Sequence, residues 1–398
     1  MEYAFSSRIS ALQPSAIREI LKVTSNPGVI SLAAGNPSPE TFPAKDMAEI
    51  AAEIFEKRFA DALQYGVSEG YDPLRRVTAE RLREKFSVGR DFDDLIIVSG
   101  GQQGIELSAK CFANEGDVIL CEEPSFIGAL NALRSYGVRL MAVPCGPQGM
   151  DMGALERILA ETPRVKLIYT IPTFQNPSGV TMPLESRRRM LALAEKHGVM
   201  ILEDNPYFEL RYDGQYVPPI KSLDAAGRVI YCGSYSKIIA PGIRLGFVCA
   251  PKAVIAKLTV AKQVSDVHSN LFFQMLVCEY LETRDLDAHI AQSRALYKEK
   301  LERMTSALRE HAPMLDFTAP QGGLFLWCVL PGGLDGAEFC RRMGGKGVAA
   351  VPGASFLVDE GAGSPAIRLN FSLPSARQID AGCARIGETL KECLGERQ

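Results

Sequence analysis

Histidine is scarce in this 398-residue sequence, and its four copies stand far apart, at His197, His268, His289 and His311. No H-E-x-x-H string occurs, so a zinc protease site and a nucleophile activated by histidine both lose support, and we predict no metal site. The ten cysteines are scattered singly and form no C-x-x-C pair. This pattern argues against a zinc cage or a disulfide framework, and we expect small buried thiols in a reducing cytoplasm.

Long apolar runs and an excess of one charge are also missing. No run approaches the length that spans a membrane, and residues 1–10 lack the basic and then apolar layout of a signal peptide. The formal net charge is -3, and acidic and basic residues are mixed along the chain. The sequence therefore argues against a membrane or a nucleic acid as the main partner.

The middle of the chain alternates short apolar runs with helical stretches. Seven apolar runs are predicted to be strands, at residues 95–98, 118–121, 139–143, 165–171, 200–202, 229–232 and 244–250. Continuous apolar strands separated by helices are typical of a mostly parallel sheet that is covered on both faces. Only a short loop joins the last two runs, so we expect the last strand to be antiparallel.

The C-terminal part has a different pattern, in which strands and helices mix without the long apolar runs. Its strand-like runs and its last helix are expected at residues 324–330, 348–351, 366–371 and 376–394. We therefore predict an N-terminal segment at 1–45 that packs on a small domain, a large domain at 46–290, and the small α+β domain at 291–398.

Polar residues gather where the predicted strands end. Ligands of an open α/β sheet bind just beyond the carboxyl ends of its strands, so these positions are informative. Asn176, Asp204 and Lys237 each come shortly after a different predicted strand. The antiparallel strand begins at this same edge with Arg244, and a glycine-rich helix start at Gly100 follows the first run.

Each of these residues alone has an ordinary explanation, as a turn residue, a partnered structural acid, a solvated lysine or a sterically required glycine turn. Together they fit pyridoxal 5'-phosphate (PLP). PLP needs an amine for its aldehyde, an acid for its pyridine nitrogen, donors for its phenolic oxygen and an anion pocket for its phosphate. Glycines at a helix start let backbone N–H groups approach such a phosphate.

Three strings make the chain resemble the class I/II aminotransferases, which are PLP-dependent enzymes. S-x-S-K-x-x-x-P-G-x-R-x-G matches residues 234–246, N-P-S/T-G matches 176–179, and D-x-x-Y matches 204–207. The resemblance runs nearly end to end and points to the kynurenine/2-aminoadipate aminotransferase group, through strings at residues 31–37, 62–65, 322–327 and 367–368. It implies an α/β PLP-transferase fold of type I, with a mostly parallel seven-stranded sheet and a smaller α+β domain. It also implies cis peptide bonds before Pro124 and Pro177.

The resemblance implies a role for each residue around the cofactor ring. Lys237 holds the cofactor as an imine and then acts as the general base for the proton shift. Asp204 pairs with the protonated pyridine nitrogen, and Asn176 and Tyr207 donate to the phenolic oxygen. Phe126 stacks on the ring.

The resemblance also assigns the phosphate to hydroxyls, an arginine and the start of a helix. The matching residues are Gly100, Gly101, Gln102, Ser234, Ser236 and Arg244. Gly101 stands where relatives often carry serine, which removes one hydroxyl donor but keeps the backbone N–H. Tyr65 matches a tyrosine that reaches the phosphate of the neighbouring subunit, so a homodimer with shared active sites is implied.

Four residues are implied in substrate binding: Gly35, Asn176, Arg368 and Arg18. Arg368 matches an arginine that binds the α-carboxylate, a bidentate task that suits a planar fork. Arg18 matches an arginine that binds the distal carboxylate of acidic substrates, and an exposed charge on a short helix is its alternative. The implied donors are 2-aminoadipate, glutamate, aromatic or branched amino acids, with a 2-oxo acid such as 2-oxoglutarate as acceptor.

Two other functions stay open on the sequence. A PLP-dependent lyase or decarboxylase uses the same cofactor cradle, although Arg368 and the overall match favour transamination. A non-catalytic amino-acid sensor behind a DNA-binding module is disfavoured, because we expect no room for such a module before Ser31.

Overall fold

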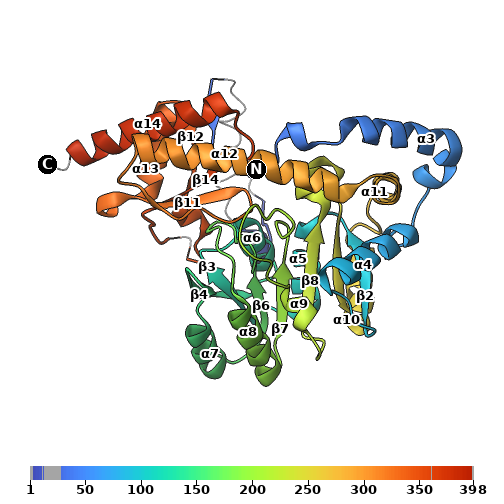
Figure 1. Cartoon of the computed structure of the whole chain (residues 1–398). Helices are drawn as coiled ribbons and strands as arrows, with labels where there is room; N and C mark the ends of the chain where they lie inside the picture. Colours follow the sequence, from blue (N-terminus) through green and yellow to red (C-terminus); the bar gives the residue numbers. More distant parts are fainter. Residues whose placement is uncertain (1–2, 11, 13–27, 360, 397–398) are drawn as a thin grey trace.

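The computed structural model describes residues 3–10, 12, 28–359 and 361–396, which form two main sheets flanked by helices (Figure 1). The larger sheet has eight strands. In spatial order they are β2 (Asp93–Val98), β9 (Gly246–Pro251), β8 (Val229–Ser234), β7 (Met200–Asp204), β6 (Val165–Thr170), β3 (Val118–Glu123), β4 (Arg139–Gly146) and β5 (Gly149–Met150). The strands from β8 to β4 run parallel, whereas β9 lies antiparallel between β2 and β8.

The larger sheet confirms the mostly parallel α/β fold, with one addition. All seven predicted runs form strands, and β9 is antiparallel as expected. The eighth strand, β5, consists of Gly149 and Met150 and pairs with the end of β4. The φ of Gly149 is 77°. Such a short hairpin leaves no periodic pattern in the sequence, because two residues cannot establish an alternation.

Side chains that alternate along the strands build a hydrophobic layer on each face of this sheet. On β3, Ile119 and Cys121 join one core cluster, whereas Val118 and Leu120 join the other. Successive residues of a strand point to opposite faces, so a continuous apolar run is buried on both. The helices on one face are α5 (Gly101–Phe112), α6 (Ile127–Arg134) and α10 (Lys252–Gln263), and those on the other are α7 (Met152–Glu161), α8 (Leu184–His197) and α9 (Ile220–Leu223).

Three further helices cover the β2 edge of the large sheet. They are α3 (Ala44–Leu63), α4 (Asp72–Phe86) and α11 (Leu271–Thr283). The helix α4 packs on β2, and α11 packs on both α3 and α4. The segment between α3 and α4 therefore lies beside the start of α11.

The smaller sheet is antiparallel and belongs to the C-terminal part. Its four strands, in spatial order, are β10 (Asp316–Phe317), β11 (Phe325–Val329), β14 (Ala366–Asn370) and β13 (Val351–Pro352). The helices around it are α12 (Leu286–His311), α13 (Gly336–Gly345) and α14 (Ala376–Gly395). Figure 1 shows α12 running from α11 to the small domain.

The N-terminal segment joins the small domain through a short strand. β1 (Ile30–Ser31) pairs in parallel with β12 (Val348–Ala349), and the 3-10 helix η1 (Pro39–Thr41) contacts α12. The predicted boundary between the large and the small domain, at residues 290 and 291, falls inside the continuous helix α12. The domain limits 1–45, 46–290 and 291–398 stay predictions.

In the part of the chain that the structure describes, no helix is both long enough and apolar enough to cross a membrane.

The packing of α14 on α12 generates a first prediction. A Cβ added at Gly387 would lie 2.1 Å from the carbonyl oxygen of His311, whereas one added at Gly344 meets no atom within 4 Å. Alanine normally stabilises a helix relative to glycine by up to about 1 kcal/mol. We expect Gly344→Ala to raise the free energy of unfolding by that order and Gly387→Ala to lower it by roughly 1–3 kcal/mol through overpacking. Thermal denaturation measures both, and a stabilised Gly387→Ala would contradict this packing.

Candidate active site

The predicted lysine lies at the carboxyl edge of the large sheet. Lys237 ends the 3-10 helix η2 (Tyr235–Lys237), which directly follows β8. Its partly buried Nζ donates to the carbonyl oxygen of Gly35 at 2.8 Å. Burial, followed by the positive charges of Arg368 and Arg244, lowers the pKa of Lys237 from 10.5 to about 8. More of this amine is therefore neutral at neutral pH than of an ordinary lysine, and the neutral form is the base and nucleophile.

The predicted acid ends the neighbouring strand, β7. Asp204 is buried, and its Oδ2 accepts a hydrogen bond from the hydroxyl of Tyr169 at 2.8 Å. Burial raises the pKa of the Asp204 carboxyl to about 7, and the hydrogen bond from Tyr169 opposes that rise. The role of Tyr169 could not be predicted from the sequence, because the residue stands in a continuous apolar strand, β6, and resembles a core residue. Within the described residues Asp204 forms no ion pair, so a cationic ligand would restore its ionised state.

Three predicted residues meet in a buried cluster. The Oδ1 of Asn176 accepts from Nη1 of Arg368 at 2.8 Å, and its Nδ2 contacts the hydroxyl of Tyr207 at 3.4 Å. Burial raises the pKa of the Tyr207 hydroxyl, while the charge of Arg368 lowers it. The Tyr207 hydroxyl is thus kept protonated and available as a donor. These residues come from the ends of β6 and β7 and from β14, so both sheets contribute to the cluster.

The guanidinium of Arg368 is buried without an acidic partner among the described residues. Its Nη2 donates to the carbonyl oxygen of Ala33 at 2.8 Å, and its Nε has no hydrogen-bond partner. The ring centroids of Phe325 and Phe356 lie 4.0 and 4.8 Å from Cζ of Arg368. Burial lowers the pKa of Arg368 to about 10. A buried cation with a free N–H favours a carboxylate ligand, because an unpaired buried charge costs free energy.

A glycine turn and an arginine lie against each other at the start of α5. A Cβ added at Gly100, whose φ is 81°, would lie 2.6 Å from Nη2 of Arg244. Only glycine fits there, so the guanidinium of Arg244 can lie directly against the backbone of the turn. Arg244 itself has a φ of 52°, and Oγ of Ser234 accepts from the backbone N–H of Ser236 at 3.1 Å. Gly101 adjoins both halves of the site, because its Cβ position lies 3.9 Å from Asp204 Oδ1 and from Ser234 Cβ.

Comparison with known proteins identifies the family of a chain with this geometry. Residues 27–386 match the family described as aminotransferase class I and II. The chain belongs to this family. It is 42% identical over 396 residues to aromatic-amino-acid aminotransferase 1 of Thermococcus litoralis, covering 98% of this chain and 95% of that protein. It is 38% identical over 395 residues to 2-aminoadipate transaminase of Thermus thermophilus, covering 98% and 97% of the two chains.

A solved structure of the family has nearly the same fold as this aminotransferase. It is the kynurenine aminotransferase of Pyrococcus horikoshii, in complex with PMP and KYN as substrates and KYA as products. The TM-score is 0.94 at 39% identity, and the match covers 98% of this chain and 97% of that chain. The likeness extends over both sheets, so the edge that gathers the residues above belongs to a shared fold.

Two further predicted residues of this aminotransferase, Phe126 and Gln102, both lie against Gly128 at the start of α6. Phe126 precedes α6, and a Cβ added at Gly128 would lie 2.4 Å from the tip of the Phe126 ring. The side-chain amide of Gln102 donates to the carbonyl oxygen of Gly128 at 2.7 Å. The side-chain amide of Gln102 is therefore engaged within the described residues.

One predicted residue, Tyr65, lies apart from this constellation. The side chain of Tyr65 is 81% exposed, and its ring meets only the edge of His268, with ring centroids 5.9 Å apart, among the ring contacts of the described residues. Tyr65 therefore stays a prediction for a partner's site. Arg18 lies outside the described residues.

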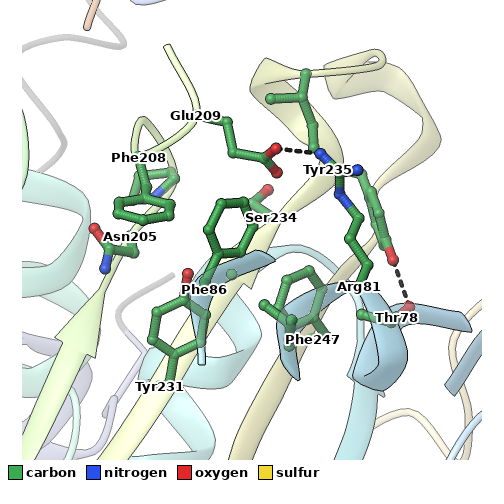
Figure 2. Close-up of a pocket in the computed structure, with 14 residues that line it drawn as sticks. Thr78, Arg81, Phe86, Asn205, Phe208, Glu209, Tyr231, Ser234, Tyr235 and Phe247 are labelled. Atoms are coloured by element: carbon green, nitrogen blue, oxygen red, sulfur yellow. Dashed lines mark hydrogen bonds and ion pairs between the residues drawn. The ribbon is translucent and has the colours of Figure 1, made fainter. Parts of the chain in front are cut away.

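A small cavity on the α4 side of β8 shares Ser234 with this constellation. Figure 2 shows its aromatic lining, with Arg81 pointing to Glu209 and the hydroxyl of Tyr235 pointing to Thr78. Its volume of about 30 Å³ holds a water molecule or two but no substrate.

In the described parts of the chain, no three histidines, cysteines or acidic residues are grouped so that they could hold a metal ion.

The loop that carries Asn176 depends on a residue that the sequence analysis missed. Glu122 is buried and accepts from the hydroxyl of Thr170 at 2.6 Å and from Nε2 of Gln175 at 3.1 Å. Burial raises the pKa of Glu122 to about 7. Glu122 stands near the end of β3, and this position did not indicate its role, since an acid at a strand end has many structural uses.

The peptide bonds before Pro124 and Pro177 are both cis, which confirms the expectation from the resemblance.

The lowered pKa of Lys237 generates a pH-dependent prediction for protein freed of bound small molecules. The folded chain loses this proton near pH 8, and the unfolded chain loses it near 10.5, so the unfolded state binds more protons between these values. The free energy of unfolding therefore rises with pH between these two values. Below about pH 8 the amine is charged in both states, and the whole cost of burying that charge lowers the stability. We expect Lys237→Met to be more stable than the native protein at pH 7, and the difference to shrink between pH 8 and 10.5. Urea unfolding measures this, and a pH-independent difference would refute the assigned cause.

Proposed function

We propose that this aminotransferase binds PLP at Lys237 and moves the amino group of an L-amino acid to a 2-oxo acid such as 2-oxoglutarate. The observation that carries the proposal is the burial of two ionisable side chains of opposite type, the carboxyl of Asp204 and the guanidinium of Arg368. Within the described residues, neither forms an ion pair. Such charges cost free energy unless ligands supply a cation for one and a carboxylate for the other.

The residues at the strand ends fit the parts of PLP. Asp204 suits the protonated pyridine nitrogen, and Asn176 and Tyr207 suit the phenolic oxygen. Phe126 suits a stacked ring face. The phosphate would take the start of α5 and the side chains after β8, namely Gly100, Gly101, Gln102, Ser234, Ser236 and Arg244. The PMP in the Pyrococcus horikoshii structure is the amine form of the same cofactor, which supports this fit.

The chain's own groups then divide the remaining tasks. When bound, PLP supplies an aldehyde that condenses with amines and a ring that accepts electron density from the substrate. Arg368 holds the α-carboxylate through its free Nε–H, and this orients the substrate's α-carbon. The Nζ of Lys237 takes the proton from that carbon, a task that the lowered pKa of its amine favours. Asp204 would keep the ring nitrogen protonated, and the carbonyl oxygen of Gly35 accepts a hydrogen bond from Nζ of Lys237.

The proposed donors follow from the names of the relatives and from one residue of this chain. The relatives act on aromatic amino acids, 2-aminoadipate and KYN by their names. We propose aromatic, branched and acidic donors here, with glutamate and 2-aminoadipate among the acidic ones. Arg18 is proposed to hold the distal carboxylate of the acidic donors.

A homodimer in the cytoplasm is part of the proposal. Exposed apolar residues gather along α3 and the segment that follows it, and on the loop after α10: Phe55, Phe59, Leu63, Tyr65, Val67, Val264 and Val267. An apolar surface of this kind is typical of a protein interface. In a homodimer it would bring Tyr65 to the cofactor phosphate of the partner subunit.

Cofactor attachment provides the direct test. We expect borohydride to fix PLP onto Lys237, as peptide mass mapping will show. Asp204→Ala should bind PLP at least roughly tenfold more weakly and lose most activity, because a buried charge-assisted bond to the ring is lost. Asp204→Glu should lose less. A label on another lysine, or near-normal turnover in Asp204→Ala, would overturn the assignment.

Donor specificity provides a second test. Arg18→Ala should lower kcat/KM roughly ten- to a hundredfold for 2-aminoadipate and glutamate, and far less for leucine or phenylalanine. Arg368→Ala should harm every donor, because all share the α-carboxylate. Steady-state assays with 2-oxoglutarate measure both variants. Equal losses for acidic and apolar donors in Arg18→Ala would remove the distal-carboxylate role.

A further inference from the structure

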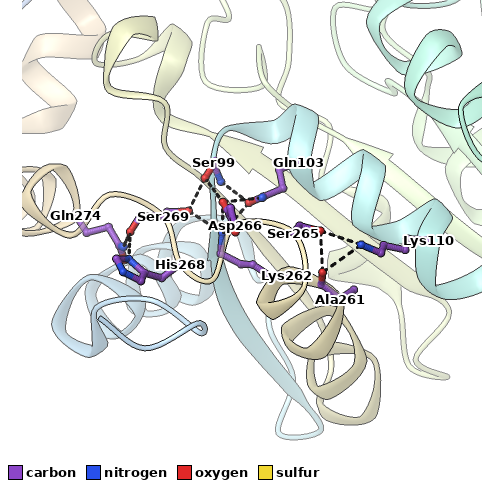
Figure 3. A network of polar contacts seen from close by, with 10 residues as sticks. All are labelled: Ser99, Gln103, Lys110, Ala261, Lys262, Ser265, Asp266, His268, Ser269 and Gln274. Atoms are coloured by element: carbon purple, nitrogen blue, oxygen red, sulfur yellow. Dashed lines mark hydrogen bonds and ion pairs between the residues drawn. The ribbon is translucent and has the colours of Figure 1, made fainter. Parts of the chain in front are cut away.

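A polar network ties the loop at residues 264–270 to two distant parts of the chain (Figure 3). The loop follows α10. On one side it binds Ser99 and Gln103, which flank the glycine turn at the start of α5. On the other side it binds the segment at residues 65–71, between α3 and α4. The network therefore lies between the proposed phosphate site of its own subunit and the exposed Tyr65.

The anchor of the network is a lysine with no solvent exposure. The Nζ of Lys262 donates to Oδ1 of Asp266 at 2.9 Å, to Oε1 of Gln103 at 2.8 Å and to Oγ of Ser269 at 3.0 Å. Buried ammonium groups persist only when they are paired and hydrogen-bonded. Lys262 thus fixes both ends of the loop against α5 at once.

The backbone of the loop is held in a conformation that its sequence disfavours. Val267 has a φ of 66°, in the left-handed region that β-branched residues avoid. The carbonyl oxygen of Lys262 accepts from the backbone N–H groups of Ser265, Asp266 and Val267 at 2.9, 3.0 and 3.2 Å. A strained residue survives only where its surroundings determine it, and such sites are often functional.

The far end of the network leads to Tyr65 through a histidine. The backbone N–H of Gly66 donates to Nε2 of His268 at 3.3 Å. Since Nε2 accepts, the proton of the neutral ring lies on Nδ1, which donates to the carbonyl oxygen of Ser269 at 2.8 Å. The ring of Tyr65 meets the edge of His268 and is otherwise exposed. His268 therefore sets both the backbone and the ring direction at this turn.

We propose that Lys262, Asp266 and His268 form a positioning network that holds Tyr65 in place for the cofactor phosphate of the partner subunit. This inference rests on the proposed function, because it needs both PLP and a homodimer. Ordering an exposed tyrosine side chain on contact with the phosphate costs free energy and weakens cofactor binding. A side chain that is already ordered avoids this cost. The network acts mainly in trans, so its loss harms the partner's site more than the site of its own subunit.

Hybrid dimers separate these two effects. One subunit carries Lys237→Ala, so only the other subunit attaches PLP. His268→Ala is placed either on the Lys237→Ala chain, which supplies Tyr65 to the intact site, or on the chain that contains the intact site. The readout is the rate at which the visible absorbance of Lys237-bound cofactor is lost after dilution, and sedimentation checks that each hybrid stays dimeric.

We expect cofactor release to be roughly tenfold faster when His268→Ala is on the chain that supplies Tyr65, as for loss of one hydrogen bond to a charged group. With His268→Ala on the other chain, the acceleration should be smaller. Equal acceleration in both arrangements, acceleration only in the second, or none in either would overturn the proposal. Tyr65→Phe, tested in the same two arrangements, is the control: its failure to act in trans would instead refute the shared site in the proposed function.

Lys262→Met in the same hybrids tests the anchor. It should accelerate release more when it is placed on the chain that supplies Tyr65, and a larger effect in the other arrangement would overturn the role of Lys262. Asp266→Asn replaces it if the methionine variant does not fold, because it keeps the shape and removes only the charge. The same asymmetry is expected for Asp266→Asn. A purely structural role would accelerate cofactor release equally in both arrangements.

Discussion

The arrangement of the active site depends on one buried guanidinium. Arg368 lies on β14 of the small sheet and donates to Asn176 beyond β6 of the large sheet and to the carbonyl oxygen of Ala33 in the N-terminal segment. The rings of Phe325 and Phe356 lie against it, so few other positions are open to it. Because a guanidinium is rigid and planar, these two bonds set the three parts of the chain relative to one another.

Burial of this charge has an electrostatic consequence for the rest of the site. The positive field of Arg368 contributes to the lowered pKa of Lys237, about 8, while burial raises the pKa of Asp204 to about 7. Both groups therefore change charge near neutral pH, in opposite directions from their ordinary values. Ligands that bring a cation to Asp204 and a carboxylate to Arg368 would settle both charges at once, which is how a site with perturbed groups favours specific chemistry.

The N-terminal segment links the two sheets through its backbone. Its residues between β1 and η1 form no helix, so their carbonyl oxygens need partners elsewhere. The carbonyl oxygen of Leu32 accepts from the backbone N–H of Asn370 at 2.7 Å, that of Ala33 accepts from Arg368, and that of Gly35 accepts from Lys237. Within four positions of the chain, this segment therefore contacts β14 of the small sheet and Lys237, which lies just beyond β8 of the large sheet. It supports the site without contributing a titratable group.

The sequence by itself determined seven of the eight strands of the large sheet and the polar residues that follow them, because strand periodicity and turn residues are local. Asp204, Asn176 and Lys237 could be predicted for that reason, and the family motifs added Arg368. Only the tertiary structure decided which groups support them. Tyr169 has the pattern of a core residue until its hydroxyl is seen on Asp204, 35 positions away. The carbonyl oxygen that meets Lys237 lies 202 positions from it, and no local spacing encodes a contact between segments that only the folded sheets bring together.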